Sequence, residues 1–377
     1  MKVGIYCNDY RPEDGGASSL VSTIIEEIEN DSDSSIKYVF FYEGKYDGDE
    51  RKTINGFEYY NVNFGHRLSL NLLSKISRAL HIEMTFRLDK IMIDEGVDIV
   101  LFTAPFYTGI KAPFIFPVWD LGHRTTNYPE ASTWYKKYGR DFLYRKMTFR
   151  AKYVLSGNQT GKNEIIKYYG LSEDKIKIVP FPVSKFCFGA SEKPGFEIPD
   201  IYFFYPAQFW HHKNHSVIVN AMRILKDKYQ CFPTVFLTGS DQGTMKLIQK
   251  RIQEYGLENQ IIITGFLKDS ELKYLYQNAT AMIYASMLGP NNLPPIEAVY
   301  LGCPVIITNI AGHLEQMGDL AAFFDGRNPE QLADIMNRFM SDKEYRNSLI
   351  DKGNKVREYW QSYKYIDSIK PLLEIQM

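Results

Sequence analysis

GPNNLPPIEA, at residues 289–298, is followed closely by GCPVII at residues 302–307, and together they predict a loop, a helix and a buried strand. The paired prolines suit the first turn of a helix, where backbone amides have no intrahelical partner, and Gly302 suits the left-handed residue that ends one. The helix would therefore present free amides at its N-terminus, with the carboxylate of Glu297 about one turn inside.

Such a helix start is chemically suited to a nucleotide diphosphate. Backbone amides and the helix dipole attract a phosphate, and a carboxylate accepts hydrogen bonds from two hydroxyls of a ribose. An ordinary buried loop and helix with Glu297 at the surface would use the same residues. The run of residues by itself leaves both interpretations open.

The same run resembles the Glu-x7-Glu segment of retaining nucleotide-sugar glycosyltransferases of family 4, whose pattern is approximately E-G-F-G-L-P-x-x-E-A-x-x-x-G-x-P-V. Seven positions agree in register, namely Leu293, Pro294, Glu297, Ala298, Gly302, Pro304 and Val305. Gly289 occupies the place of the first Glu, so the segment is more similar to a subgroup that reads G-P-T-N-x-P-P-x-E. The resemblance implies a donor site that includes Gly289, Asn291, Asn292, Leu293 and Glu297.

A second cluster, YPAQFWHHKNH at residues 205–215, follows directly after a predicted strand. Lys213, in this strand-to-helix loop, can place its ammonium against a diphosphate. The cluster resembles the Arg-x4-Lys phosphate clamp of the family, with Gln208 in the arginine position; Gln208 donates a hydrogen bond but brings no charge. The three histidines match no metal-ligand spacing, so we expect no zinc site and no metal cofactor.

Two glycine-containing loops complete the expected donor site. In PEDGGAS, at residues 12–18, Gly15 and Gly16 let backbone amides approach a ligand, and the loop resembles the family segment that contacts the donor's diphosphate-sugar. In TGFL, at residues 264–267, we expect Gly265, Phe266 and Leu267 to contact the base through backbone atoms.

VWDLGHR, at residues 118–124, ends a predicted strand and resembles the family's His-Asp segment beside the transferred sugar, with Trp119 where His is frequent. We expect His123 to hydrogen-bond the donor sugar or the acceptor hydroxyl, with Asp120 orienting its ring. A structural histidine capped by Asp120 is an equally good interpretation.

Composition agrees with a two-domain enzyme. The chain has 377 residues, a net charge of −1 and 45% hydrophobic residues, which indicates neither a disordered chain nor a nucleic-acid partner. Its four cysteines are far apart in the sequence, so we expect them to be reduced, as is typical of cytoplasmic proteins. The chain shows neither a signal-peptide layout at its start nor the run of about 20 apolar residues that a membrane span requires, so any membrane contact would be peripheral, at the inner face of the plasma membrane.

Predicted strands and helices alternate in two series, which is typical of parallel sheets covered by helices on both faces. We expect two Rossmann-like domains of the GT-B fold facing a cleft: residues 1–183 for the acceptor, a linker at 184–199, and residues 200–355 for the nucleotide-sugar donor. The expected strands are 3–6, 38–42, 99–103, 114–118, 154–156, 175–179, 202–206, 235–238, 260–264 and 281–284.

Residues 356–377 carry Tyr359, Trp360, Tyr363, Ile366, Ile369 and Leu373 at helical spacing. In the GT-B fold the last helix crosses back to the first domain, and Trp360 would sit in that hinge. A helix packed on its own domain is the alternative.

The family resemblance implies a metal-independent retaining transfer of a hexose from a UDP- or GDP-sugar to a saccharide, in bacterial surface polysaccharide synthesis. Residues 134–152 are basic and aromatic, as in helices that lie on anionic membranes, and residues 67–90 are a second such segment, so a lipid-linked acceptor is expected; a charged, solvated face is the alternative. Two other functions stay open. One is a nucleotide-sugar 2-epimerase or phosphorylase on the same fold, and the other is a non-catalytic nucleotide-sugar-binding subunit, which the losses at Gly289 and Gln208 favour.

Overall fold

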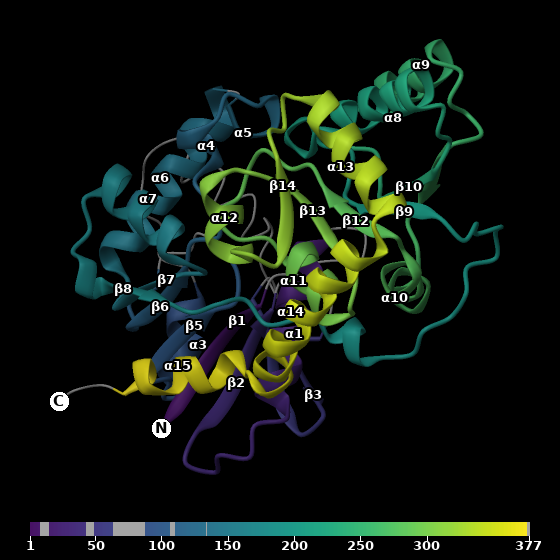
Figure 1. The fold of residues 1–377 in the computed structure, drawn as a ribbon. Coiled ribbons are helices and arrows are strands. Elements are labelled where there is room, and N and C mark those ends of the chain that lie inside the picture. The colour runs from purple at the N-terminus through teal and green to yellow at the C-terminus, as the bar shows by residue number, and fades with distance from the viewer. Residues whose placement is uncertain (8–14, 43–48, 63–86, 106–109, 133, 375–377) are drawn as a thin grey trace.

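The computed structural model describes residues 1–7, 15–42, 49–62, 87–105, 110–132 and 134–374 (Figure 1). Within these ranges, two sheets form the centres of two α/β domains. The first sheet has eight strands in the order β3-β4-β2-β1-β5-β6-β7-β8, and the second has six in the order β11-β10-β9-β12-β13-β14. Neighbouring strands are parallel, and the hairpin of β3 and β4 is antiparallel.

The first domain contains β1 (Lys2–Cys7), β2 (Lys37–Tyr42), β3 (Arg51–Ile54), β4 (Phe57–Asn61), β5 (Ile99–Phe102), β6 (Phe114–Pro117), β7 (Tyr153–Ser156) and β8 (Ile176–Ile178). Its helices are α1 (Gly16–Glu29), α3 (Arg87–Asp94), α4 (Gly122–Thr125), α5 (Pro129–Ser132), α6 (Trp134–Arg150) and α7 (Gln159–Tyr169).

The second domain contains β9 (Tyr202–Pro206), β10 (Thr234–Thr238), β11 (Ile261–Gly265), β12 (Ala281–Tyr284), β13 (Val305–Thr308) and β14 (Ala321–Phe324). Its helices are α8 (His215–Tyr229), α9 (Met245–Glu254), α10 (Asp269–Asn278), α11 (Leu293–Tyr300), α12 (Ala311–Met317), α13 (Pro329–Ser341) and α14 (Lys343–Ser362).

The central strands are continuous apolar runs because helices cover both faces of each sheet. In β12 and β13 every residue is buried, and the same holds for β5 and β6 in the first domain. Because of these apolar runs, the alternation of strands and helices and the fold class were predicted correctly. The hairpin β3–β4 was missed, since β3 is mostly exposed and its sequence RKTI carries no apolar run.

The chain ends in two helices rather than the one expected over residues 356–377. α14 stops at Ser362, Tyr363 is extended, and α15 (Tyr365–Leu373) begins after it. The break is fixed by partners distant in sequence: Tyr363 donates to the carbonyl oxygen of Pro180 at 2.8 Å, and Glu27 of α1 accepts the amide of Ile366 at 3.2 Å. Nothing in the local sequence marks this interruption.

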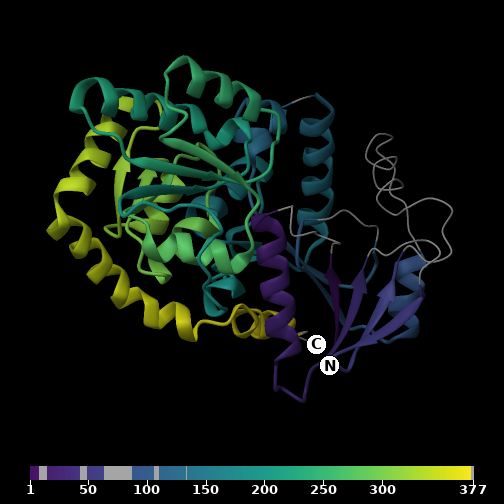
Figure 2. The same ribbon diagram turned by 90° about the vertical axis from the view of Figure 1, so that its right-hand side faces the viewer.

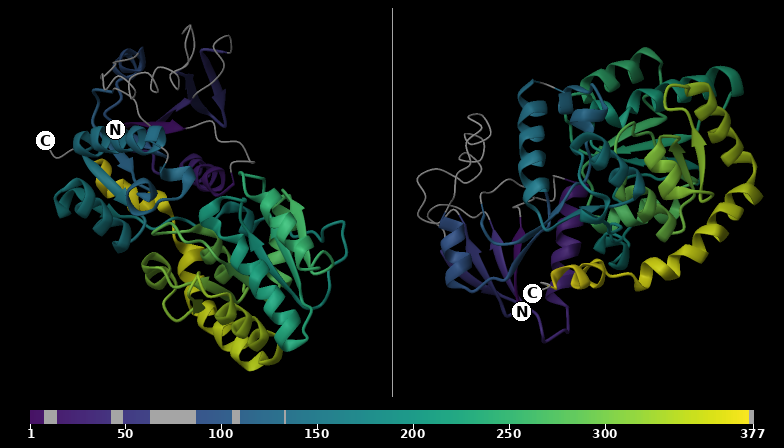
Figure 3. Two further views of the ribbon diagram at one scale, coloured as in Figure 1. Left: turned by 90° about the horizontal axis from the view of Figure 1, so that it is seen from above. Right: turned by 90° about the vertical axis from the view of Figure 1, so that its left-hand side faces the viewer.

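The expected return of the C-terminal segment to the first domain is confirmed. α15 lies against α1, as Figures 2 and 3 show from three further directions. Four of its side chains are buried in the same core as β1, namely Tyr365, Ile366, Ile369 and Leu373. Trp360, on the last turns of α14, packs instead against the core of the second domain, so it lies just before the crossing.

The predicted domain boundaries stay predictions. The expected linker, residues 184–199, contains a short 3₁₀ helix at Lys185–Phe188. Of the helices in the described ranges, none combines the length and apolar character that crossing a bilayer requires.

Candidate active site where the two domains meet

Loops that follow strands of both sheets come together, as the strand-end rule for open α/β sheets predicts. Gly15, with φ +69°, lies so close to Gln208 that an added Cβ would sit 3.5 Å from its side chain. A Cβ at Gly157, just after β7, would lie 2.4 Å from the side-chain nitrogen of Asn291. The 3.5 Å separation at Gly15 is an ordinary contact, whereas at Gly157 only glycine lets the first domain's backbone approach the predicted donor loop this closely. Residues 12–14 of the predicted N-terminal loop lie outside the described residues.

Lys213 lies in a 3₁₀ turn at His211–Lys213 that follows β9. Its Nζ donates a hydrogen bond to the hydroxyl of Tyr284 at 2.7 Å. Burial lowers the pKa of Lys213 to about 8, while the negative charge of Asp120, across the domain junction, raises it. Among the described residues, Lys213 has no carboxylate within ion-pair distance, so two N–H donors of its ammonium are available to an anion.

Asp120 is an ionised carboxylate held by its own domain. Its Oδ1 accepts the amide of Gly122 at 2.7 Å and the guanidinium of Arg140 at 3.0 Å. Burial raises the pKa of Asp120, but Arg140 and the Gly122 amide together bring it below its ordinary value. Asp120 therefore faces Lys213 as a fixed negative charge.

His123 is fully buried, and the prediction that Asp120 orients it is wrong. Its Nε2 lies 3.1 Å from the hydroxyl of Tyr169, and its ring stacks on Tyr144 with centroids 5.4 Å apart. Burial lowers the pKa of His123 to about 4, so the ring is neutral. Asp120 is engaged by Arg140 instead. Its Nδ1 is buried without a partner among the described residues, so the predicted contact of His123 with the sugar or acceptor stays a prediction.

The predicted donor loop enters α11 as expected. Gly289 has φ +111°, and Leu293 is the first residue of the helix, which has proline in its first turn. Leu293 is buried among apolar residues of the first domain, and a Cβ at Gly16 would lie 3.9 Å from it. Asn291 accepts a hydrogen bond from Gln316 of α12. The loop is thus held from both domains.

Glu297 is buried, so its interpretation as a surface residue is wrong. Ser184 donates to Oε1 at 2.5 Å and Tyr276 of α10 donates to Oε2 at 2.9 Å. Burial raises the pKa of Glu297 to about 7, against the lowering effect of the two hydroxyl donors. A ribose at this carboxylate would have to share it with both hydroxyls.

Four other predicted residues differ in their surroundings. The amide nitrogen of Gln208 donates to Ser240 at 3.1 Å, and its oxygen accepts the indole N–H of Trp210 at 3.0 Å. Gly265 ends β11 with φ +73°, and Phe266 beside it is 53% exposed. Leu267 packs partly against the second core.

Sequence reasoning missed a polar chain behind Lys213. Tyr284, at the end of β12, donates to Asn292 Oδ1 at 2.8 Å, and Asn292 Nδ2 lies 3.0 Å from Nε2 of His313. The sequence hinted at this chain only through the positions of its residues. Tyr284 and Thr308 end the neighbouring strands β12 and β13, and His313 follows soon after. Spacing alone does not join these residues to Lys213.

A second missed feature is a carboxylate that joins the domains. Glu315 of α12 accepts the backbone amides of Gln159 and Thr160, at the N-terminus of α7, at 2.7 Å each. The Thr160 hydroxyl donates to the same carboxylate at 2.5 Å. A negative charge at a helix N-terminus is favourable, so this contact stabilises the observed apposition of the domains.

Glu130 of α5 makes a related contact with the Lys213 turn. It accepts the amide of His212 at 2.9 Å and lies 2.6 Å from its Nδ1. Burial raises the pKa of Glu130, but these contacts with His212 lower it to about 2.

Replacing Glu315 with alanine should lower the melting temperature, because it leaves three donors at the start of α7 without their acceptor. The lost cap is worth about 1–2 kcal/mol, and small-angle scattering should show a larger radius of gyration. Glu258→Ala, at an exposed glutamate in the second domain, is the matched control. Equal melting temperatures and radii for both variants would contradict this role.

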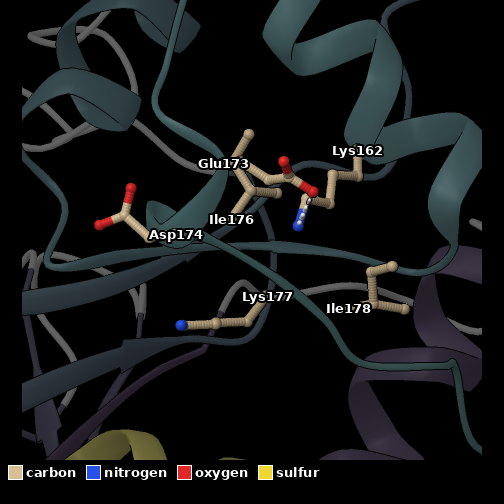
Figure 4. A pocket seen from close by; sticks show the side chains of 6 residues that line it. All are labelled: Lys162, Glu173, Asp174, Ile176, Lys177 and Ile178. Carbon is tan, nitrogen blue, oxygen red and sulfur yellow. Dashed lines mark ion pairs between the residues drawn. The ribbon is translucent and has the colours of Figure 1, made fainter.

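A pocket of about 640 Å³ lies elsewhere, between α7 and the segment that forms β8 (Figure 4). It is lined by Lys162, Glu173, Asp174, Ile176, Lys177 and Ile178, and Lys162 pairs with Glu173 at 3.3 Å. None of the predicted site residues lines it. In the described ranges, no three His, Cys, Asp or Glu side chains gather so as to hold a metal ion.

The second domain is similar to known glycosyltransferases. The family model "Glycosyl transferases group 1" matches residues 190–356. The O-antigen chain mannosyltransferase RfbU of Salmonella typhimurium is 30% identical over 209 residues, which are 52% of this chain and 56% of RfbU. The serotype-specific mannosyltransferase WbdA of Escherichia coli is 24% identical over 222 residues, 56% of this chain and 27% of WbdA. The chain thus spans about half of one relative and about a quarter of the other.

Solved structures agree over nearly the whole chain. Sucrose-phosphate synthase from Thermosynechococcus elongatus has a TM-score of 0.75 at 13% identity, covering 99% of this chain and 97% of that one. Anabaena Alr3699/HepE, solved with UDP and glucose, has a TM-score of 0.69 at 15% identity; the match covers 99% of this chain and 98% of that one. At these identities the likeness establishes the fold alone. This chain therefore has the GT-B fold, and its residues 190–356 match the family model of glycosyl transferases group 1.

Proposed function

We propose that this chain is a retaining glycosyltransferase that moves a hexose from a UDP- or GDP-sugar to a saccharide acceptor in bacterial surface polysaccharide synthesis. The observation that carries the proposal is Lys213, a partly buried ammonium without a carboxylate partner among the described residues, beside the donor loop of a group 1 domain. Mannose is the first sugar to test, because RfbU and WbdA are named mannosyltransferases.

In this proposal the diphosphate lies between Lys213, the amides at the start of α11 and the backbone at Gly15 and Gly16. The acceptor oxygen attacks the anomeric carbon from the face that the phosphate leaves, and the departing phosphate takes the acceptor's proton. Such a reaction needs chiefly positioning and stabilisation of negative charge, so it requires no divalent metal. Asp120, fixed by Arg140, faces the same region and is suited to a hydroxyl of the sugar or acceptor.

A non-catalytic nucleotide-sugar-binding subunit is the second candidate, favoured by Gly289 and Gln208. The family clamp has an arginine where Gln208 hydrogen-bonds Trp210 and Ser240. The two functions differ in turnover: slow hydrolysis of the donor in the absence of acceptor is expected of the enzyme and contradicts the idle subunit.

For the acceptor, we propose a lipid-linked saccharide reached through α6 at an anionic membrane surface. Tyr138 and Phe149 of α6 are 56% and 54% exposed, which suits an interfacial contact. Part of the helix's positive charge is used internally, since Arg140 pairs with Asp120. Flotation with anionic but not neutral liposomes, lost on Tyr138→Ser with Phe149→Ser, is the expected result; no flotation with either kind would remove this part of the proposal.

The test of the donor site is a thermal-shift panel of UDP, GDP, ADP, CMP and TDP, with and without magnesium. A diphosphate at 100 times its dissociation constant stabilises the native state by about 2.7 kcal/mol, so one nucleotide should raise the melting temperature by several degrees. Equal shifts with and without magnesium would support the metal-independent reaction. The absence of a shift with every nucleotide would refute the donor site.

A further inference from the structure

His313 has only one protonation state compatible with its surroundings. It is fully buried near the start of α12, and its Nδ1 lies 3.0 Å from the carbonyl oxygen of Thr308 and 2.9 Å from that residue's hydroxyl. A carbonyl oxygen can only accept, so Nδ1 carries a hydrogen. Burial lowers the pKa of His313 to about 3, so the ring is neutral and Nε2 is an acceptor.

This acceptor fixes the side chain of Asn292. Only the Nδ2 end of the amide can donate to His313 Nε2, 3.0 Å away, so Oδ1 must face Tyr284. The Tyr284 hydroxyl, 2.8 Å from Oδ1, then has to donate to it, and its oxygen accepts from Lys213 at 2.7 Å. Each group from Lys213 to Thr308 donates to the next one in a single direction.

The direction of this chain decides what Lys213 can do. Because the Tyr284 hydroxyl donates its hydrogen to Asn292, its oxygen can only accept a hydrogen bond from Lys213. A charged ammonium is a suitable donor. The contact also holds Nζ in place beside Tyr284, with its ring centroid 5.0 Å away. Two N–H donors are left for a ligand. Sequence reasoning expected Asn292 to bind the donor, yet its side chain is used by Tyr284 and His313.

We propose that His313 and Asn292 are positioning residues that act through Tyr284 to orient the Lys213 ammonium toward the donor's diphosphate. The inference rests on the proposed function. It assigns a role to three side chains without requiring any of them to contact the sugar. These side chains should therefore support transfer through their hydrogen bonds and not through packing alone.

The tautomer can be tested without any sugar by NMR of the histidine rings. A neutral Nδ1–H signal should persist from pH 5 to 8 and vanish in His313→Gln. His215 is an internal control with the opposite tautomer. Its Nε2 lies 3.2 Å from the carbonyl oxygen of Ala207 and must carry the hydrogen. An Nε2–H tautomer for His313, or titration near pH 6, would overturn the proposal whether or not the protein transfers sugar.

The direction is tested by Asn292→Asp. A carboxylate has no donor for Nε2, so His313 must become protonated to bind it, and its pKa should rise into the NMR-accessible range. Transfer by this variant should fall as the pH increases through that new value, because above it two acceptors face each other. Adding His313→Gln supplies an amide donor to the carboxylate and should remove this pH dependence.

A wild-type pH profile for Asn292→Asp would refute the positioning role even in an active enzyme. If no transfer is found at all, the pH dependence of Lys213 labelling by an amine-reactive reagent still decides the point. Tyr284→Phe removes the acceptor of the ammonium and should lower the pKa of Lys213, which mass spectrometry of the labelled peptide would show. Tyr205→Phe is the matched control, because its hydroxyl donates to the Lys213 carbonyl oxygen, at 2.6 Å, and not to the ammonium; an equal shift in both variants would contradict the proposal.

Discussion

Lys213→Ala should lower the kcat of sugar transfer by about 100- to 1000-fold, the range typical of removing one preorganised donor to developing negative charge. The loss should be large because Gln208, at the other clamp position, carries no charge that could substitute. Initial rates at saturating donor measure it directly. Lys246→Ala, at an exposed lysine of α9, is the matched control and should be unchanged. A Lys213→Ala variant within threefold of the native rate would refute the assignment.

The pH profile gives an independent signature of the same residue. The pKa of Lys213 is lowered to about 8 chiefly by burial, so the binding-competent ammonium predominates below that pH and is lost above it. The kcat/KM of the free enzyme should therefore fall as the pH rises through about 8. This decrease in kcat/KM above about pH 8 should be absent from the Lys213→Ala variant.

Glu297→Ala should cost about 3 kcal/mol of the free energy of unfolding, because the hydroxyls of Ser184 and Tyr276 lose their buried acceptor. The affinity for the nucleotide should fall with it, since Glu297 lies on the helix whose N-terminus is part of the proposed donor site. Urea unfolding and nucleotide titration measure the two effects. Undiminished stability in the alanine variant would contradict the role of Glu297 as an internal acceptor.

The conservative variant Glu297→Gln separates charge from hydrogen bonding. The folded-state pKa is raised to about 7 from an ordinary value of 4.5, so the folded protein holds a proton that the unfolded chain releases first. Native stability should therefore fall as the pH rises from about 4.5 to about 7, by up to roughly 3 kcal/mol from this group. Glu27 and Glu164 also have raised pKa values, so the diagnostic result is a smaller fall in Glu297→Gln than in the native protein.

The sequence predicted the layers of this protein well because its central strands are buried on both faces and read as unbroken apolar runs. β12, AMIY, and β13, VIIT, are examples. It failed where tertiary partners override local pattern. The break at Tyr363 depends on Pro180 and Glu27, which are far away in sequence.

The candidate site shows the same division. Lys213 and the loop at residues 289–292 could be proposed from the sequence because strand-to-helix loops carry their own signals of glycine, proline and charge. The predicted link between Asp120 and His123 was wrong because residue type shows that a carboxylate is near in sequence, but not that it pairs with Arg140. The chain from Lys213 to His313 could not be predicted, since it joins three strand ends that only the order of the sheet brings together.

The position of α15 has a consequence for biosynthesis. Its four buried side chains belong to the core built on β1, so the first domain lacks part of its interior until residues 365–373 have been made. All strands of the second sheet are translated in the interval, which at about 5–20 residues per second lasts roughly ten seconds or more. The first domain, whose strands leave the ribosome earlier, thus cannot complete its core until α15 has been made.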